Sequence, residues 1–442
     1  MRLVCAADLD VQYASACSPS GGGVPPLEFR HLTGDDPLVS LVEQLANDNN
    51  PPPVVSISYG GAEAHVVNHS AARRFDIEVM LLSVQGVTIV AASGDSGANG
   101  KSTCGYDPVW PATSPWVTAV GATYLEQLSY QSDPLAAAGF YRAVGTPDLL
   151  SRTSARAFSL SSVRGYNVIP TEHAVDANQA GKGLTFSTGG GFSTLYTAPP
   201  WQEAVTDAYL FDSSPVDGFN RAGRGYPDLT MVGSRLLVVI NEQLYLASGT
   251  SASAPIFAAL AARVNLVRSA EGRPPMGSLN PMLYHAREHW LAIAQQMGGQ
   301  LPFYDVAIGA NKCPEVERCC STGFEAAIGW DPVNGLGSVT AESLYSISVA
   351  CNIPLNKSVG EFDAFTANSP TKEDVDAFTA GVSHTSCEIS PTPPASSNAT
   401  QVLLALYDAT AGNEWKDNTN WLSGNPCTWK GVSCNGGIVT RV

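Results

Sequence analysis

The chain has 442 residues, of which 44% are hydrophobic and 14% are charged, and its formal net charge is −16. This length and apolar content favour one large domain with a substantial core and a smaller second segment. The acidic balance and the lack of a basic patch in the sequence exclude nucleic-acid binding. No apolar run of about 18 residues occurs, so we expect no membrane-spanning segment.

The N-terminal part of the chain alternates amphipathic helices with short apolar strands. We expect helices at 36–48 and 70–85, and strands at 54–59, within 87–97 and at 115–123. This alternation predicts an α/β fold with a mainly parallel sheet flanked by helices. Residues 126–183 show no clear periodicity, and we expect an insertion or an irregular region there.

Further along the chain, residues 236–247 are predicted to form two strands joined near Asn241–Glu242. A long apolar helix is predicted to begin at or just after Ser251. Residues 351–397 are polar and rich in Ser, Thr and Pro, which is typical of a linker. The expected organisation is a domain over 1–350, this linker, and a small segment over 398–442.

Ten cysteines, an even number, favour disulfide bonds and an oxidising compartment, which we expect to be extracellular or lysosomal/vacuolar. The sequence leaves the pairing open. The N-terminal residues do not form a signal peptide, because their apolar run is too short and acids interrupt it. We therefore expect that the natural N-terminus is missing.

Gly249-Thr250-Ser251, followed by Pro255, is the sharpest chemical signal. A strand ends in a tight turn here and a long helix begins, so the Ser251 hydroxyl lies at a helix N-terminus. Backbone N–H groups and the helix dipole favour negative charge there, as the oxyanion formed by a serine nucleophile requires. The alternative is that Ser251 merely caps the helix.

A second signal is Ser93-Gly94-Asp95-Ser96-Gly97, in which a buried strand runs into a glycine-rich turn that carries one carboxyl. By itself, Asp95 is an ordinary turn residue. Together with the Ser251 motif, it resembles the sedolisin (serine-carboxyl peptidase) family. Further matching stretches in family order include 56–60, 108–123, 189–193 and 224–228.

The resemblance covers residues 1 to about 347 and implies a subtilisin-like α/β fold. It also implies peptide-bond hydrolysis at acid pH, by an endopeptidase or a tripeptidyl-peptidase, and one bound Ca²⁺. The implied partner is a polypeptide substrate, and we expect a monomer. A carboxyl kept protonated can donate a hydrogen bond to an oxyanion, which is the role that the resemblance gives to Asp95.

The resemblance assigns the remaining site residues by position. Ser251 is the expected nucleophile, and Asp10 is the expected second carboxylate of the family's acid pair. The expected substrate-binding residues are Ser58, Tyr59, Gly60 and Gly190. The expected calcium ligands are the carboxylates of Asp305 and Asp331 and the backbone carbonyls of Val306, Ala327 and Gly329, since calcium prefers several oxygen ligands.

The general base is the one departure from the family pattern. The family places a Glu four residues before the acid at Asp10, so that both carboxylates share one helix face. Ala6 occupies that position and accepts no proton, and Asp8 points to a different face. Loss of the base of a serine triad can lower kcat by about 10⁶-fold. A true pseudopeptidase and a truncated or misassigned start both explain this departure, and we favour the second.

Histidines do not replace the missing base. Subtilisins use a histidine in a His-Gly-Thr setting, and none of the seven histidines has one. His285 and His289 have helical i, i+4 spacing, but no matching third ligand is evident, so surface or packing roles are expected.

Residues 401–442 resemble the N-terminal cap of an extracellular leucine-rich-repeat array, and a Cys427–Cys434 disulfide is expected. Such caps close the exposed end of a solenoid core. Two functions follow from the sequence. The first is a calcium-binding acid serine peptidase; the second is an inactive peptidase-like binding or scaffold module fused to a leucine-rich-repeat recognition domain.

Overall fold

The computed structural model describes most of the expected peptidase domain and short pieces near the C-terminus. The described residues are 9–15, 27–30, 32, 36–65, 69–101, 103–126, 171–178, 184–213, 215–289, 302–316, 318–350, 419–420, 428, 430, 433–435 and 438–441.

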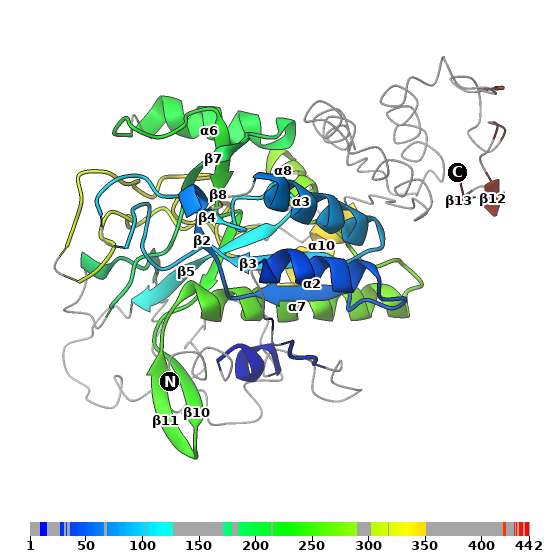
Figure 1. The fold of residues 1–442 in the computed structure, drawn as a ribbon, viewed down its shortest axis with the longest axis horizontal. Coiled ribbons are helices and arrows are strands. Elements are labelled where there is room, and N and C mark those ends of the chain that lie inside the picture. Colours follow the sequence, from blue (N-terminus) through cyan, green and yellow to red (C-terminus); the bar gives the residue numbers. More distant parts are fainter. Residues whose placement is uncertain are drawn as a thin grey trace, which may run out of the picture.

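A mainly parallel sheet forms the centre of the fold (Figure 1). Strands β1 (Val54–Ile57), β3 (Thr88–Ala92) and β5 (Thr118–Glu126) are neighbours and run parallel, and β9 (Leu229–Val232) also runs parallel to β5. The fifth strand, β6 (Thr171–Ala174), pairs antiparallel with the end of β5. The α/β prediction is confirmed.

Strand β6 corrects one expectation. It lies inside 126–183, which showed no periodicity and was expected to be an insertion or irregular, yet it extends the sheet by four residues. A strand this short is too brief to show a period-2 pattern, and its pairing with β5 comes from distant residues. Residues 127–170 and 179–183 lie outside the described part of the chain.

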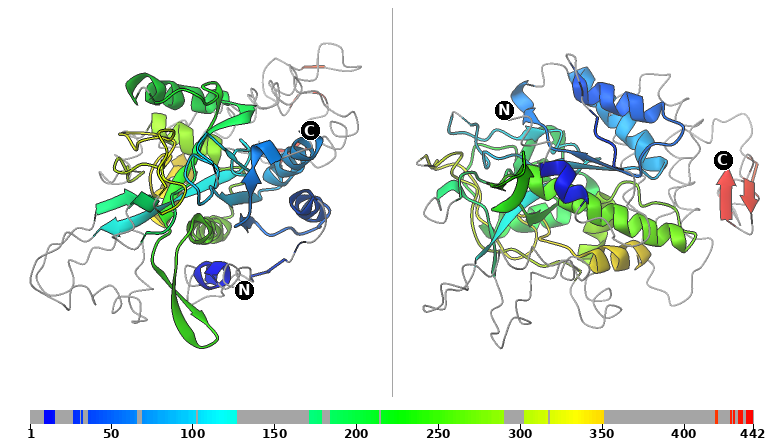
Figure 2. Two further views of the ribbon diagram at one scale, coloured as in Figure 1. Left: turned by 60° about the vertical axis from the view of Figure 1, so that its left-hand side comes forward. Right: turned by 90° about the horizontal axis from the view of Figure 1, so that it is seen from below.

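Helices cover both faces of this sheet, as the side-chain alternation of β3 shows. Val90 and Ala92 pack into the larger core cluster with α7 (Thr250–Ala270), whereas Ile89 and Ala91 pack with α2 (Pro37–Ala46) and α3 (His69–Val84). Successive side chains of a strand point to opposite faces, so α7 and the α2–α3 pair lie on opposite sides. Figure 2 shows the same arrangement from two further directions.

The other described elements surround this frame. They are β2 (Gly61–Ala62), η1 (Glu63–His65), β4 (Val109–Trp110), β7 (Gly191–Thr197), α6 (Pro200–Ser213), β8 (Gly223–Tyr226), β10 (Leu236–Ile240), β11 (Gln243–Ala247), α8 (Asn280–Glu288), α10 (Ala341–Ala350), β12 (Ser433–Asn435) and β13 (Ile438–Arg441). The predicted strand pair at 236–247 is confirmed as the β10–β11 hairpin, which extends from the body in Figure 1. Its turn residues, Asn241 and Glu242, both have positive φ.

The Arg224–Asp228 stretch, which matches the family pattern in the sequence, has a buried structural role. Arg224 and Asp228 are both fully buried and form an ion pair of 2.6 Å. Asp228 also accepts hydrogen bonds from the Ala119 backbone N–H and the Tyr284 hydroxyl, at 2.8 and 3.0 Å. A buried ion pair is tolerated when hydrogen bonds satisfy its charges. β5 and α8 supply such hydrogen bonds to Asp228, whereas Nε of Arg224 has no partner among the described residues.

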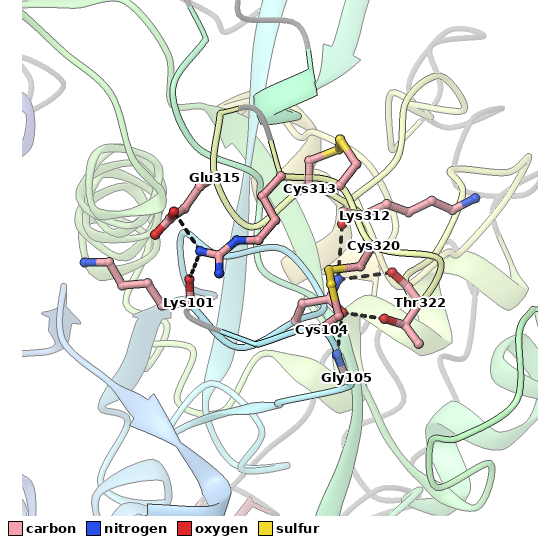
Figure 3. Close-up of a disulfide and its surroundings, with 11 residues drawn as sticks. Lys101, Cys104, Gly105, Lys312, Cys313, Glu315, Cys320 and Thr322 are labelled. Carbon is pink, nitrogen blue, oxygen red and sulfur yellow. Dashed lines mark hydrogen bonds and ion pairs between the residues drawn. A yellow bond between two sulfur atoms is a disulfide. The ribbon is translucent and has the colours of Figure 1, made fainter.

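Two disulfides are present among the described residues, and they supply pairings that the sequence left open. Cys104 pairs with Cys320 across 216 residues, and Cys313 pairs with Cys319 across six. Figure 3 shows the Cys104–Cys320 bond and its surroundings. In the same loop, Arg318 donates a hydrogen bond to the carbonyl of Lys101 and forms an ion pair with Glu315. The first disulfide ties the loop after β3 to the segment 311–325. Cys427 lies outside the described residues, so its expected bond to Cys434 stays a prediction.

Helix α7 is the one described helix that is long and apolar enough to cross a membrane. Of its most apolar window, 67% is buried inside the fold, as is usual for the core helix of a globular domain. Its apolar composition is therefore explained by its contacts with the sheet.

Candidate active site

The N-terminus of α7 is the centre of the candidate site. Gly249 caps the helix with φ of 155°, and Ser251 is its second residue, half-buried. A Cβ at Gly249 would lie 3.1 Å from Oδ2 of Asp95, so this position requires glycine both for its backbone angle and for space. The Gly249–Ser251 motif therefore brings the Asp95 carboxyl and the start of α7 into contact.

Asp95 lies in the turn after β3 and binds the first residue of α7. Its Oδ1 atom accepts hydrogen bonds from the backbone N–H and the hydroxyl of Thr250, at 2.8 and 2.9 Å. The Thr250 hydroxyl oxygen accepts in turn from the N–H of Gly94, at 3.1 Å. Desolvation by the surrounding protein raises the pKa of Asp95, and the two Thr250 hydrogen bonds only partly offset this.

Asp10 is held beside α7 by the short helix over residues 9–15. Leu9 packs in a small core cluster with Leu236, Val238 and Ala252, and so joins this helix to β10 and α7. Gln12 exchanges two hydrogen bonds with the backbone of Val239, at 2.7 and 2.9 Å. The β10–β11 hairpin thereby fixes the helix that carries Asp10.

Ser58, which follows β1, connects Asp10 to the backbone of Ser251. Its hydroxyl lies 2.7 Å from Oδ1 of Asp10 and 3.2 Å from the carbonyl oxygen of Ser251. In a regular helix, that carbonyl accepts from the N–H of the residue four positions later, but Pro255 has none. The proline of the motif therefore leaves the Ser251 carbonyl available to Ser58.

The carboxyl of Asp10 is easier to protonate than that of an ordinary aspartate. Desolvation by burial raises its pKa from 3.8 to about 6, and the hydrogen bond from Ser58 offsets part of the increase. Asp10 is therefore protonated in mild acid, at a pH where an exposed aspartate is ionised. Ala6 and Asp8, which bear on the missing base, lie outside the described residues.

The four expected substrate-binding residues fall into two groups. Ser58 is half-buried against Asp10, while Tyr59 and Gly60 are exposed beside it and open to a ligand. Gly190 is buried, and a Cβ there would lie 2.1 Å from the carbonyl oxygen of Pro332. Its glycine is explained by this close approach, and a contact with substrate stays a prediction.

The five expected calcium ligands lie in one neighbourhood. Asp305 accepts a hydrogen bond from the N–H of Gly329 at 2.7 Å, and buried Asp331 accepts one from the N–H of Ala327 at 3.0 Å. Val306 places its carbonyl 2.8 Å from Nδ2 of Asn334. Burial raises the pKa of Asp331 to about 8, with a smaller contribution from the charge of Asp305.

Asn334 is a residue of this neighbourhood that the sequence did not single out. Its side-chain Oδ1 is buried and finds no hydrogen-bond partner among the described residues, although buried polar atoms are almost always paired. Oxygen atoms from two carboxylates, backbone carbonyls and this amide match the ligand preference of calcium. The donor set therefore fits a Ca²⁺ ion.

Comparison with known proteins agrees with this geometry. Residues 33–271 match the subtilase family, and residues 396–435 match the leucine rich repeat N-terminal domain. Physarolisin of Physarum polycephalum is 32% identical in an alignment 356 residues long, which covers 75% of this chain and 54% of that protein. Human tripeptidyl-peptidase 1 is also 32% identical, in an alignment 340 residues long, which covers 75% of this chain and 49% of that protein.

The chain thus spans about half the length of the curated relatives it matches. Among solved structures, Pseudomonas sedolisin (serine-carboxyl proteinase) covers 72% of this chain and 70% of its own, with a TM-score of 0.50 and 24% identity. This structural similarity supports the fold, while the sequence relatives and the matched family model support the family assignment. The chain therefore belongs to the subtilase family, and its resemblance to the sedolisins is confirmed.

Proposed function

We propose that this domain is a serine peptidase in which Ser251 attacks the carbonyl of a peptide bond in a polypeptide substrate. The observation that carries the proposal is the meeting of three distant segments at the start of α7. Asp95 binds Thr250, and Ser58 joins Asp10 to the Ser251 carbonyl. A helix cap alone requires none of these contacts, so the capping alternative leaves them unexplained.

Asp95 is the proposed oxyanion donor. Because its Oδ1 already accepts two hydrogen bonds from Thr250, a proton is best placed on Oδ2. A carboxylic acid held in this way can donate to the oxygen of the tetrahedral intermediate, where negative charge develops. The raised pKa of Asp95 keeps this proton in place over a wider pH range than for an exposed aspartate, which favours activity in acid.

The base is the weak point of the proposed mechanism. The contacts of Asp10 reach the Ser251 carbonyl through Ser58, and none of the described contacts joins Asp10 to the Ser251 hydroxyl. Position 6, where the family has its Glu, is alanine. We therefore propose that this chain hydrolyses peptides slowly, because the loss of a general base lowers kcat by between about 10²–10⁴-fold, the usual contribution of such a group, and about 10⁶-fold, the loss in a serine triad.

Hydrolysis of casein and of a tripeptide-releasing substrate at about pH 4 tests the assignment of the nucleophile. We expect low but measurable turnover, which Ser251→Ala abolishes and which Ser253→Ala leaves nearly unchanged. Ser253 is a matched control because it is buried in the same helix and bonds the Met231 carbonyl. Equal turnover by the native chain and Ser251→Ala would refute the proposal.

The second candidate, an inactive binding module, is favoured by Ala6 and by the C-terminal match to a leucine-rich-repeat N-terminal domain. In that case the candidate site at Ser251 binds a peptide without cleaving it. Binding of a peptide aldehyde separates the two functions. A covalent, reversible adduct on Ser251 requires a reactive hydroxyl, whereas an inactive module binds the peptide without an adduct.

We also propose that Asp305 and Asp331, with the carbonyls of Val306, Ala327 and Gly329 and the Asn334 amide oxygen, hold a structural Ca²⁺ ion. The ion would neutralise two neighbouring carboxylates in the loop before α10 and so stabilise the folded state. Extracellular or lysosomal location is the matching environment, because the two disulfides need an oxidising compartment.

A further inference from the structure

We infer that the C-terminal turn of α8 is a binding site for zinc or another first-row divalent metal ion, separate from the calcium site. The three candidate ligands are His285 and Glu288, at positions i and i+3 of this helix, and His289, its C-cap residue at i+4, so they lie on one side of the helix end. The sequence showed the histidine pair but not the third ligand. Glu288 could be placed beside the histidines only when the structure showed that the helix continues through it.

The distances place the three side chains in one cluster. One potential ligand atom from each lies within 4.8 Å of the other two. The two imidazole rings have centroids 4.3 Å apart, and Nδ1 of His285 lies 3.8 Å from Oε2 of Glu288. Zinc bonds of about 2.0–2.1 Å in a tetrahedral site separate the ligand atoms by about 3.3 Å. The cluster therefore needs a closure of roughly 1.5 Å at most.

Glu288 and His289 can supply this closure because both are exposed, while the backbone beneath them is fixed. The N–H of His289 still bonds the carbonyl of His285 at 3.1 Å, so helical spacing holds through the last ligand. Met282, Leu283 and Ala286 are buried in the main core and anchor the helix. Ligands on a rigid helix lose little conformational entropy when they bind a metal ion.

The ligand types select the ion. Two imidazoles and one carboxylate suit zinc, copper or nickel, whereas Ca²⁺ and Mg²⁺ prefer oxygen ligands. The C-terminus of a helix carries partial negative charge, which favours a cation there. Arg287 of the same turn lies near Gly329, in the neighbourhood of the calcium ligands. The last turn of α8 therefore faces two different sites with different residues.

The competing explanation is a plain histidine–carboxylate ion pair without metal. The chain provides its own control for this, because Nε2 of His173 lies 3.4 Å from Oε2 of Glu126 and forms such a pair on the β5–β6 ladder. If a single ion pair were enough to hold zinc, both clusters would bind it equally.

Calorimetric titration of Zn²⁺ into the full chain tests the inference, with thiols alkylated and excess Ca²⁺ present. A parallel titration with Co²⁺ reads coordination from its visible absorption. We expect one site that His289→Ala and His285→Ala each weaken by about tenfold or more. Glu288→Gln should weaken it less, and His173→Gln should leave it unchanged. Circular dichroism shows whether each variant is folded, and exposed His289 decides the matter if His285→Ala does not fold.

Zinc affinity that is the same in His289→Ala as in the native chain would overturn the inference. So would the absence of any zinc binding, or an equal loss in His173→Gln. None of these results depends on peptide hydrolysis, so they leave the proposed function untouched.

Discussion

At the residue scale, Ser58 links the acid and the nucleophile of the candidate site. Its hydroxyl faces both Asp10 and the Ser251 carbonyl, which Pro255 leaves without its helical donor. If Asp10 is protonated, it can donate to Ser58, and Ser58 can donate to Ser251, so one line of hydrogen bonds runs from the first helix to α7. The protonation of Asp10 should therefore be visible in the stability of the fold.

The raised pKa of Asp10 fixes the sign of that effect. Its value is about 6 in the folded chain against an ordinary 3.8, so the folded state binds the proton more tightly. This contribution to stability is present below about pH 4 and is lost as the pH rises through 6. The loss amounts to about 3 kcal/mol at most, at about 1.36 kcal/mol per pKa unit.

Asp10→Asn should remove this part of the pH dependence, because asparagine stays neutral and still accepts from Ser58. The measurement is the free energy of unfolding of both proteins in urea between pH 3.5 and 7, values chosen to bracket about 3.8 and 6. We expect the difference between them to grow over this range in favour of the variant. Ser58→Ala should move the pH at which this stability is lost to a higher value, because the hydrogen bond from Ser58 lowers the pKa of Asp10. A constant difference would contradict the raised pKa.

Whether a site residue could be predicted depends on how local its sequence pattern is. Ser251 and Asp95 could be predicted because each sits in a short motif at a strand end. For Ser58, substrate binding stays a prediction. The sequence did not predict that its hydroxyl contacts Asp10 and Ser251, because these residues are 48 and 193 positions away and no local pattern encodes such contacts. Asn334 was missed for the same reason, since its unpaired amide oxygen becomes meaningful only when Val306 and Asp331 lie beside it.

At the element scale, disulfide bonds hold the loops that flank the sheet. The Cys104–Cys320 disulfide closes a segment of 216 residues and joins the loop after β3 to the segment before α10, whereas Cys313–Cys319 closes only six. Loop-closure entropy predicts about 5 kcal/mol of stabilisation for the first and about 2 kcal/mol for the second.

Paired serine variants test this difference. We expect Cys104→Ser/Cys320→Ser to lower the free energy of unfolding about twice as much as Cys313→Ser/Cys319→Ser, measured by guanidinium denaturation under the same conditions. Because each pair removes two sulfurs and no charge, the pairs are matched controls for one another. Equal losses would mean that native packing around the sulfurs, and not chain entropy, dominates.

The elements also show where sequence patterns succeed. Helices α2, α3 and α7 and strands β1, β3 and β5 lie where periodicity placed them, because their apolar side chains are buried in the two core clusters on either side of the sheet. Strand β6 was not predicted, since four residues give too little pattern. The helix over 9–15 depends on the β10–β11 hairpin, more than 220 positions away, for its place.

At the scale of the whole molecule, the proposed calcium site should set the overall stability. Asp305 and Asp331 lie near one another, and among the residues that the structure describes the Asn334 amide oxygen has no hydrogen-bond partner. Removal of calcium with a chelator should lower the thermal midpoint, and added Ca²⁺ should restore it while Mg²⁺ should not, because Mg²⁺ demands a tighter octahedral shell. Asp305→Asn should show little response to either ion. A thermal midpoint that stays the same after the chelator is added would contradict the calcium site.

The central claim is that the domain carries a sedolisin-type active site in which only the base is absent. Ala6→Glu tests it most directly, because it restores the glutamate that the sedolisin pattern has four residues before Asp10. We predict that kcat on a peptide substrate at about pH 4 rises by about 10²–10⁴-fold over the native chain. The gain should disappear in Ala6→Glu/Ser251→Ala. A folded Ala6→Glu protein with unchanged turnover would contradict the claim.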